Sequence, residues 1–312
     1  MAGSLFSHLI LAAANQPTVA AAVTNSPIAR GLVRRFVAGE TLDEAMEAAG
    51  SLNDAGFTVA MAYLGENTSS EEEADAATCE ALRVLEAVSS RGLDPYFSVK
   101  LTQLGLDVGR HIAVGNAVRL LERARDLKAF VRLDMEGSSY TSAIIEVFSE
   151  LRPQFDNVGI VLQACLYRTR ADVEAVTRLG GRVRLCKGAY SEPPHIAYRR
   201  KRDTDRNFVR LMEYLLRHDA QPAIATHDPA IIEHAREFAR THGIGADRFE
   251  FQMLYGVRRD LQEQLARAGY RVRIYLPYGS QWYPYLTRRL AERPANLWFV
   301  VGNLIREGRS PR

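Results

Sequence analysis

Two adjacent arginines, Arg288 and Arg289, stand where they could bind a carboxylate group. They lie in residues 272–294, which begin as an apolar, β-branched run and continue as a helical pattern. On such a helix both arginines share one broad face with Tyr285 and Glu292, at spacings of three and four residues. A guanidinium group matches a carboxylate through paired hydrogen bonds, so the two arginines could form a carboxylate clamp. The simpler interpretation is that they belong to an ordinary charged surface. The place of this strand and helix in the chain favours the clamp.

Ionisable and polar side chains also stand at the ends of other apolar, strand-like runs. Core packing alone does not explain polar groups at so many strand ends. Arg184 alternates with Val183 and Leu185 inside such a run, and a buried arginine needs an anion or a hydrogen-bond acceptor as its partner. The strand-end groups are Glu66, Lys100, Asp134, Glu136, Gln163, Lys187, Thr226, His227, Asp228, Gln252 and Tyr275.

The elements that must position these side chains repeat along the chain. Eight apolar runs alternate with helix-period segments, which is the pattern of a parallel sheet covered by helices. Eight such units predict an α/β fold of the (βα)8, TIM-type barrel class, and the lack of a GxGxxG motif after the first run argues against a Rossmann fold. A barrel of this class carries its active site at the carboxyl ends of its strands. The predicted strands are residues 57–65, 96–101, 130–136, 158–165, 182–189, 222–228, 249–254 and 272–279.

The chain before the first predicted strand has a different character. It contains the helical segments ARGLVRRFVAG and TLDEAMEAAGSLNDAG. We interpret residues 1–50 as an N-terminal helical arm packed on the barrel, and residues 51–312 as the barrel that carries the active site.

The composition suits a soluble globular protein, because 47% of the 312 residues are hydrophobic and 25% are charged. No apolar run reaches the roughly 18 residues of a membrane span. The three cysteines have no CxxC spacing, which favours reduced thiols in a cytoplasmic protein. They are Cys79, Cys165 and Cys186.

The charge pattern indicates neither a nucleic-acid partner nor a metal. The net charge of +3 is small, and the basic run 198–206 also contains Asp203 and Asp205 and lacks an aromatic platform. We interpret that run as a solvated loop and helix start. No HxH, HExxH or carboxylate cluster has the spacing of metal ligands.

Three strand-end groups have plainer interpretations. Lys100 and Asp134 could form a structural ion pair in the mouth of the barrel. His227 could be a hydrogen-bonded core histidine.

Several motifs together resemble those of proline dehydrogenase, the flavoenzyme that starts proline degradation to glutamate. They are FVAGET, YLGE, FSVKL, LDMEG, VRLCKGAY, ATHD, FEFQMLYG and RIYLPYG followed by YLTRRLAE, in the family's order from about residue 36 to 300. The resemblance implies a distorted (βα)8 barrel that holds FAD at the carboxyl ends of its strands. The departures are Ser191, Asp228 and Tyr255, where the longer bacterial members often have Trp, Asn and His.

The resemblance also implies roles for single residues around the cofactor. Arg184 would lie near the flavin N5 atom, and Gln163 at the edge of the isoalloxazine ring. Lys187, Gly188 and Ala189 would approach the phosphate and ribose of FAD. The remaining implied flavin contacts are Met135, Thr226, His227, Leu254 and Glu292.

For the substrate, the resemblance implies that Arg288 and Arg289 clamp the carboxylate of L-proline. Asp134, a catalytic residue with Arg184, would orient Lys100 or Tyr275. The other implied substrate contacts are Lys100, Tyr275, Tyr278 and Glu66, which would pair with the first arginine of the clamp.

The implied reaction transfers a hydride from C5 of L-proline to FAD and forms Δ1-pyrroline-5-carboxylate. A membrane quinone would accept the electrons, and a separate pyrroline-5-carboxylate dehydrogenase would use the product. The resemblance implies a monofunctional enzyme in the cytoplasm, with any membrane association peripheral and at the inner face.

Two other functions fit the barrel. One is a lyase of the class I aldolase type, with Lys187 or Lys100 as the Schiff-base amine. The other is a non-catalytic barrel that binds a small carboxylate, which the many ionisable strand ends disfavour.

Overall fold

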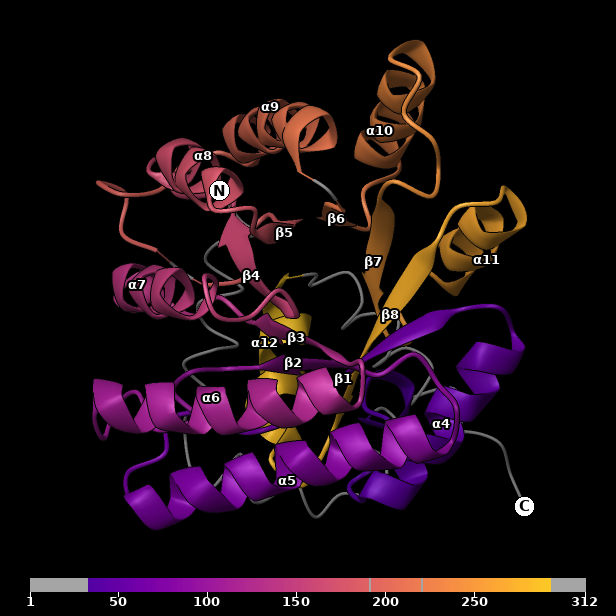
Figure 1. Ribbon diagram of the computed structural model, residues 1–312. Coiled ribbons are helices and arrows are strands. Elements are labelled where there is room, and N and C mark those ends of the chain that lie inside the picture. The colour runs from indigo at the N-terminus through magenta and orange to yellow at the C-terminus, as the bar shows by residue number, and fades with distance from the viewer. Residues whose placement is uncertain (1–32, 191, 220, 293–312) are drawn as a thin grey trace, which may run out of the picture.

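The computed structural model describes residues 33–190, 192–219 and 221–292 of the chain, and for residues 288–292 it describes the backbone only (Figure 1). Most of the predicted N-terminal arm, residues 1–32, therefore lies outside the described residues.

Eight parallel strands form a closed barrel in which each strand pairs with its neighbours in the sequence, and the last strand pairs with the first. This confirms the predicted α/β barrel of the TIM type. Each crossover runs through a helix on the outside of the barrel, as parallel pairing requires. The strands are β1 (Thr58–Tyr63), β2 (Tyr96–Val99), β3 (Phe130–Leu133), β4 (Val158–Gln163), β5 (Arg182–Cys186), β6 (Ala223–Ala225), β7 (Glu250–Leu254) and β8 (Val272–Tyr278).

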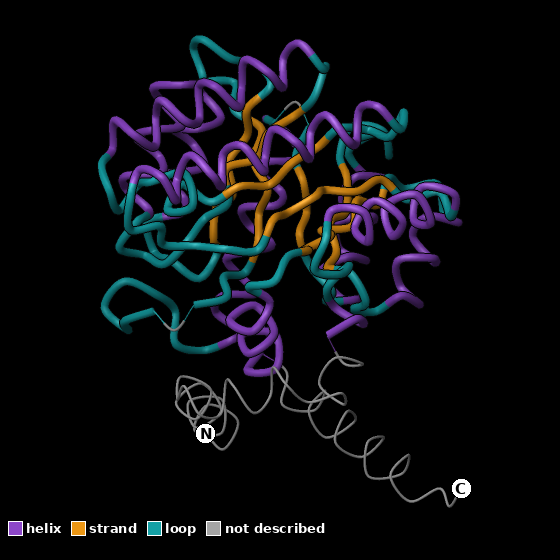
Figure 2. The backbone as a smooth tube through the Cα atoms, turned by 90° about the horizontal axis from the view of Figure 1, so that it is seen from below, coloured by secondary structure: helices purple, strands orange, loops and turns teal. Residues whose placement is uncertain are grey.

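The helices surround this barrel, as the backbone tube in Figure 2 shows. Figure 1 shows α12 crossing one end of the barrel, whereas α5 to α11 lie around its flank. Because α12 follows β8 directly, the end that it crosses is the carboxyl end of the strands. The helices are α4 (Leu42–Asp54), α5 (Glu71–Ser90), α6 (Arg110–Asp126), α7 (Thr141–Leu151), α8 (Thr169–Arg178), α9 (Lys201–His218), α10 (Pro229–Thr241), α11 (Arg259–Arg267) and α12 (Trp282–Glu292).

All strands except β7 end earlier than their apolar patterns predicted. β3 ends at Leu133 and β5 at Cys186, although the apolar runs continue to residues 136 and 189. After β3 the run continues because the loop residues are also buried: Met135 is 7% exposed and packs in the core. The residues that follow β5 are half-buried. The polar groups of these segments consequently lie on loops at the barrel mouth.

The described part of the predicted arm, residues 33–50, packs on the barrel. Its backbone is hydrogen-bonded to the end of β8, since the amide of Ala38 donates to the carbonyl of Pro277 at 2.8 Å and the amide of Gly279 donates to the carbonyl of Gly39 at 3.0 Å. Met46 of α4 is buried in the same apolar cluster as Val59 of β1. The predicted boundary at residue 50 falls within α4.

The strands carry apolar side chains toward the helices and polar side chains into the barrel. In β8, Ile274 is fully buried in the apolar core, whereas Arg273 and Tyr275 reach across the interior. The guanidinium carbon of Arg273 lies 4.1 Å from the ring centroid of Tyr96 on β2. The inside of this barrel is therefore charged, and its charges must find partners within it.

Gly159 of β4 makes room for one of these charges. A Cβ atom at this position would lie 2.7 Å from Nη1 of Arg132 and 2.8 Å from the carbonyl oxygen of Arg182. Because a backbone atom cannot easily move away, the site requires glycine.

We expect Gly159→Ala to lower the free energy of unfolding by about 1–3 kcal/mol, as overpacking of a tight interior does. The matched control is Gly50→Ala in α4, where nothing lies within 4 Å of the added Cβ. That change should stabilise the protein by about 0.5–1 kcal/mol, because alanine is the better helix former. Urea unfolding of both variants tests the pair, and equal effects would contradict the steric argument.

Candidate active site

Arg184 of β5 is the centre of a buried hydrogen-bonded network inside the barrel. Its Nη1 donates to Oδ1 of Asp134 at 2.8 Å, and its Nη2 donates to Oγ of Ser98 at 2.8 Å. The hydroxyl of Tyr275 donates to Oδ2 of Asp134 at 2.9 Å, and the guanidinium carbon of Arg184 lies 5.5 Å from the tyrosine ring centroid. Asp134 thus orients Tyr275, one of the two partners expected for it.

The electrostatics of this network keep the arginine charged and the tyrosine neutral. Arg184 and Asp134 are 5% and 9% exposed. Burial alone would lower the pKa of Arg184, but the neighbouring Tyr96 and Asp134 raise it above its ordinary value. Burial, and then the charge of Asp134, raise the pKa of Tyr275 well above its ordinary value. The tyrosine therefore remains a hydrogen-bond donor to the carboxylate.

Lys100 follows β2 at the mouth of the barrel. Its Nζ donates to the carbonyl oxygen of Gly65 at 3.2 Å, beside the half-buried Glu66. The carboxylate of Asp134 is engaged by Arg184 and Tyr275. The alternative of a structural ion pair between Lys100 and Asp134 is therefore not what the structure forms.

Glu136 lies two residues after Asp134 and holds the loop that carries Lys100. Its carboxylate accepts hydrogen bonds from the amide and the hydroxyl of Thr102, at 3.2 and 2.5 Å. Glu136 is 3% exposed, and burial raises its pKa to about 7 despite these hydrogen bonds and the nearby charge of Lys100. The mouth of the barrel therefore contains a carboxyl group that titrates near neutral pH.

Lys187, just after β5, belongs to a cluster of two lysines and two carboxylates. Its Nζ lies 2.5 Å from Asp205 and 2.9 Å from Asp228, and Lys201 contacts the same two carboxylates at 2.5 and 3.4 Å. Burial alone would raise the pKa of Asp228, but Lys187 and then Lys201 lower it to about 2. The Asp228 carboxylate is consequently charged at neutral pH.

The loops after β5, β6 and β7 are held by specific contacts. Gly188 has φ +111°, and a Cβ there would lie 2.4 Å from Sγ of Cys165, so only glycine fits. Nε2 of His227 accepts a hydrogen bond from the amide of Leu254 at 2.9 Å, and Oγ1 of Thr226 accepts one from the amide of Asp228 at 3.1 Å. The bond to His227 connects the loop after β6 to the end of β7, and the bond to Thr226 lies within the loop after β6. Ala189, in the loop after β5, is half-buried.

Three buried polar atoms of the interior lack a hydrogen-bond partner among the described residues. They are Nε of Arg184, Oε1 of Gln163 and Oε1 of Gln252. The amide nitrogen of Gln163 donates to the carbonyl of Glu136 at 3.1 Å, which fixes that side chain. Buried polar groups without partners are uncommon in proteins, so these atoms indicate a ligand that supplies both an acceptor and a donor.

The carboxylate clamp cannot be placed by its side chains. Those of Arg288, Arg289 and Glu292 lie outside the described residues, although their backbone forms the second half of α12. The first half of α12 is anchored at the barrel mouth: Trp282 donates from Nε1 to Glu40 at 3.0 Å and packs in an apolar cluster with Leu64. Tyr275 packs against that cluster.

Tyr278 does not join the other predicted substrate contacts. It is 1% exposed, and its hydroxyl donates to Oε1 of Glu80 on α5 at 2.8 Å. Residues 275 and 278 are an odd number of positions apart, so their side chains leave the strand on opposite faces. We correct the expectation accordingly: Tyr278 lies on the helix-facing side of β8.

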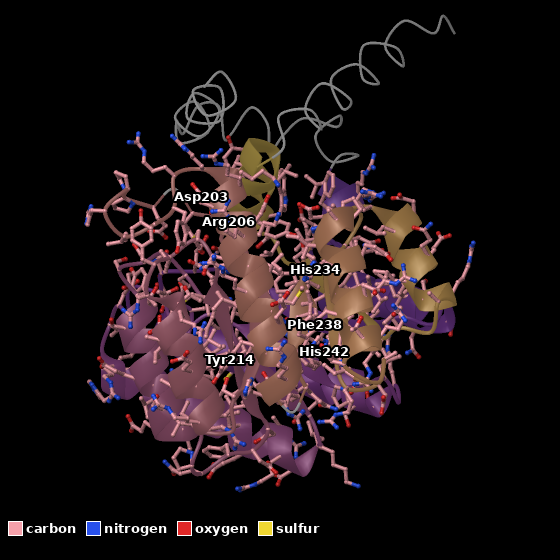
Figure 3. All side chains as sticks on the ribbon, turned by 90° about the horizontal axis from the view of Figure 1, so that it is seen from above. Asp203, Arg206, Tyr214, His234, Phe238 and His242 are labelled. Atoms are coloured by element: carbon pink, nitrogen blue, oxygen red, sulfur yellow. The ribbon has the colours of Figure 1, made fainter. Side chains whose placement is uncertain are left out.

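Sequence reasoning missed several residues of these networks, among them Ser98, Thr102, Lys201 and Asp205. Ser98 alternates with Tyr96 and Lys100 along β2, a signal that could have placed it inside the barrel. Asp205 gave no such signal. It lies in the basic run near Asp203 and Arg206 at the start of α9, which Figure 3 labels on the outer surface. Asp205 lies in the first turns of α9, and its carboxylate contacts Nζ of Lys187 at 2.5 Å.

Comparisons with known proteins identify what this arrangement belongs to. Residues 45–301 match the family model described as proline dehydrogenase. The chain belongs to the proline dehydrogenase family. It is 39% identical to proline dehydrogenase of Deinococcus radiodurans over 98% of this chain and 100% of that protein. It is 38% identical to proline dehydrogenase 1 of Bacillus subtilis (strain 168) over 88% of this chain and 91% of that one.

A solved structure has the same barrel. Proline utilization A from Bdellovibrio bacteriovorus, inactivated by N-propargylglycine, superposes with a TM-score of 0.78 and 27% identity. The match covers 84% of this chain and 32% of the longer one. As a proline dehydrogenase family member, the chain is an oxidoreductase of proline metabolism, and the family implies a flavin cofactor. In the part of the chain that the structure describes, no helix is long and apolar enough to cross a bilayer.

The raised pKa of Glu136 predicts a pH-dependent stability. A carboxyl group whose pKa rises from 4.5 to about 7 on folding stabilises the native state below pH 4.5, and this contribution is lost as the pH rises through 7. In the wild type, titration of Glu136 should lower the free energy of unfolding by on the order of 3 kcal/mol between those pH values. Glu136→Gln should abolish this decrease, because glutamine does not titrate. The measurement is the free energy of unfolding of variant and wild type at pH 5 and pH 8.

The matched control is Glu146→Gln, at an exposed position on α7. Its difference from wild type should be the same at both pH values. If the Glu136→Gln difference were also independent of pH, Glu136 would not titrate in this range.

Proposed function

We propose that this chain oxidises L-proline to Δ1-pyrroline-5-carboxylate with FAD as its cofactor. The observation that carries the proposal is the network of Arg184, Asp134 and Tyr275 at the barrel mouth, next to buried polar atoms that need a ligand. The names of the relatives from Deinococcus radiodurans and Bacillus subtilis support the same substrate.

The residues present fit a flavin. The edge of an isoalloxazine ring offers both hydrogen-bond donors and acceptors, which Oε1 of Gln163 and Nε of Arg184 lack. Arg184 would donate near N5, and its charge favours an electron-rich ring. Lys187, Gly188 and Ala189 would hold the phosphate and ribose. Contacts from Met135, Thr226, His227, Leu254 and Glu292 complete the proposed cofactor site.

When bound, the flavin supplies the acceptor for the hydride that leaves C5 of proline. The protein orients the substrate. Arg288 and Arg289 would clamp its carboxylate from α12, with Lys100 and Glu66 at the same mouth and Tyr275 against the ring. Support for the clamp comes from the backbone of α12, which starts next to Tyr275.

Asp134 has a positioning part in this proposal as well as a catalytic one. Its two oxygens hold Arg184 and Tyr275 at 2.8 and 2.9 Å, so one carboxylate couples the flavin side to the substrate side of the site. Trp282, Tyr285 and Leu286 form an apolar wall beside Tyr275 that excludes water from this region.

The proposal also covers the electron acceptor and the enzyme that uses the product. A membrane quinone would take the electrons, so the cytoplasmic enzyme would associate peripherally with the inner face of the membrane. The product would pass to a separate pyrroline-5-carboxylate dehydrogenase. Family resemblance supports these statements.

The lysine-based lyase has less support. Its amine must be neutral and free to attack a carbonyl. Nζ of Lys187 instead contacts two carboxylates, and Nζ of Lys100 donates to a backbone carbonyl.

The visible spectrum of the purified protein tests the proposed function. We expect flavin bands that bleach on anaerobic addition of L-proline and persist with D-proline or glutamate. A colourless protein that FAD cannot reconstitute would contradict the proposal. Trapping of a carbonyl substrate by borohydride would then favour the lyase.

A pair of tyrosine variants tests the assignment of the site. Tyr275→Phe removes the hydrogen bond to Asp134, and we expect kcat/KM for L-proline to fall about tenfold, since a buried charged acceptor loses its donor. Tyr278→Phe removes the hydrogen bond to Glu80 on the other face and should leave kcat/KM unchanged. Steady-state kinetics with L-proline measure kcat/KM of both variants. An equal loss of kcat/KM in the two variants would show that these tyrosines affect activity only through the stability of the protein.

A further inference from the structure

A cavity of about 390 Å³ lies at the amino ends of the barrel strands, opposite the proposed active site. Tyr96, Phe130, Arg182 and Glu250, the first residues of their strands, line it. Its volume is within the range of about 300–1,000 Å³ that small-molecule sites occupy. The cavity is thus large enough for a small ligand.

The lining of this cavity is strongly cationic. Three carboxylates, those of Asp94, Asp156 and Glu250, also line it. Against them stand six cationic side chains: Arg125, Lys128, Arg132, Arg182, Arg271 and Arg273. The excess of positive charge indicates an anionic ligand.

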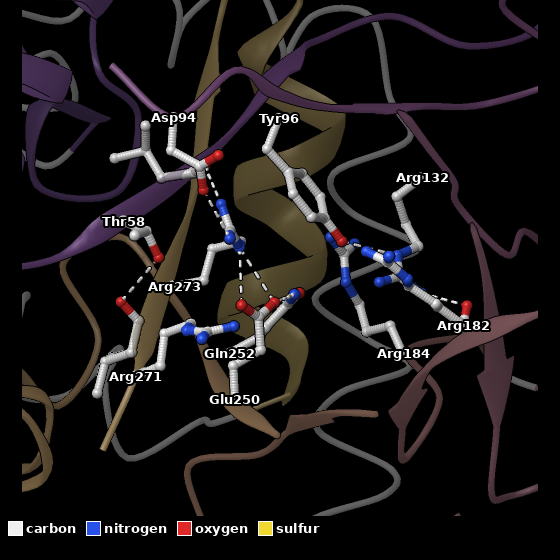
Figure 4. Close-up of polar contacts among 12 residues, drawn as sticks. Thr58, Asp94, Tyr96, Arg132, Arg182, Arg184, Glu250, Gln252, Arg271 and Arg273 are labelled. Carbon is white, nitrogen blue, oxygen red and sulfur yellow. Dashed lines mark hydrogen bonds and ion pairs between the residues drawn. The ribbon is translucent and has the colours of Figure 1, made fainter. Parts of the chain in front are cut away.

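Arg273 already has its counterions within the protein. Its guanidinium group lies 2.8 Å from Asp94 and 3.0 Å from Glu250, as the dashed lines in Figure 4 show. This one arginine therefore uses two of the three carboxylates. The third, Asp156, is exposed at the rim.

Arg132 and Arg182 have no such counterion. Arg132 is 2% exposed and donates to the hydroxyl of Tyr96 at 2.7 Å and to the carbonyl of Arg182 at 2.5 Å. Both guanidinium carbons lie near the ring centroid of Phe130, at 5.1 and 5.0 Å. Among the described residues, neither forms an ion pair with a carboxylate. Burial accordingly lowers the pKa of Arg132.

A neighbouring carboxylate is committed elsewhere. Asp219 accepts hydrogen bonds from the amides of Val183 and Gln221, at 2.8 and 2.9 Å. The charges of Arg132 and Arg182 act on Asp219 without overcoming the burial that raises its pKa, and Asp219 forms no ion pair with either arginine among the described residues. Arg132 is buried and Arg182 is half-buried, and two guanidinium groups beside one cavity make an anion the natural partner.

We propose that this cavity binds a small dianion through Arg132, Arg182 and Arg271. The ligand class is an oxyanion with two negative charges, which either a phosphate or a dicarboxylate supplies. Arg271 is half-buried, precedes β8 and lines the same cavity, on the side away from Arg132 and Arg182 (Figure 4). Its Nη2 donates to the carbonyl of Asp247 at 3.4 Å. Because the site is at the other end of the barrel, it does not depend on the proposed oxidation of proline.

Isothermal titration of the protein as purified, with its cofactor added, tests the proposal. The added cofactor keeps its own phosphate site filled. The probes are inorganic phosphate and succinate, each in chloride buffer of matched ionic strength. We expect saturable binding of at least one probe. Phosphate alone would identify a phosphate site, and succinate alone a dicarboxylate site.

Arg182→Gln should weaken that binding about tenfold or more, as loss of a charge-assisted contact does. The matched control, Arg178→Gln, changes an exposed arginine on α8 outside the cavity and should bind like wild type. Arg271→Gln is the second variant, in case Arg182→Gln unfolds. Unchanged affinity in a folded Arg182→Gln or Arg271→Gln variant, or no binding beyond that of chloride, would overturn the proposal.

Discussion

A barrel with charges inside it must pair each charge that it buries, and the ion pair of Arg184 with Asp134 meets this constraint where the proposed active site begins. The two side chains come from β5 and from the residue after β3, so they meet only in a closed barrel. Ser98 and Tyr275 add one hydrogen bond each from two further strands, which leaves Nε of Arg184 without a partner among the described residues. Four parts of the barrel are thereby fixed relative to one another by a single buried pair.

The same alternation along the strands produces a second charged layer below the first. Arg273 and Tyr275 are two residues apart on β8 and both face the interior, one toward Glu250 and the other toward Asp134. The two layers influence each other, because Glu250 and Tyr96 both raise the pKa of Arg184. The lower layer has more cations than counterions at its cavity, whereas the upper layer is balanced by Asp134.

The mouth of the barrel is completed by segments that lie far apart in the chain. Residues 33–40 bind to the end of β8 through backbone hydrogen bonds and to α12 through Trp282. The start of α9 supplies Asp205 and Lys201 to the loop after β5. The proposed cofactor and substrate therefore share one opening whose walls come from both ends of the described chain.

The sequence by itself determined the barrel and most of the strand-end groups. Its eight apolar runs specify strands because period-two and continuous apolar patterns bury one or both strand faces, and Arg184 stood out as a charge in such a run. The apolar pattern could not show where each strand ends. The predicted range of β3 was too long because the loop residue Met135 is also buried. Alternation along β8 already puts Tyr275 and Tyr278 on opposite faces, and the expectation that both contact the substrate came from the family resemblance. The partners of Asp134, the return of Asp205 to Lys187 and the cationic cavity around Arg132 were decided by tertiary structure alone. Each of these brings together side chains that are distant in sequence, and only closure of the barrel brings them within hydrogen-bonding distance.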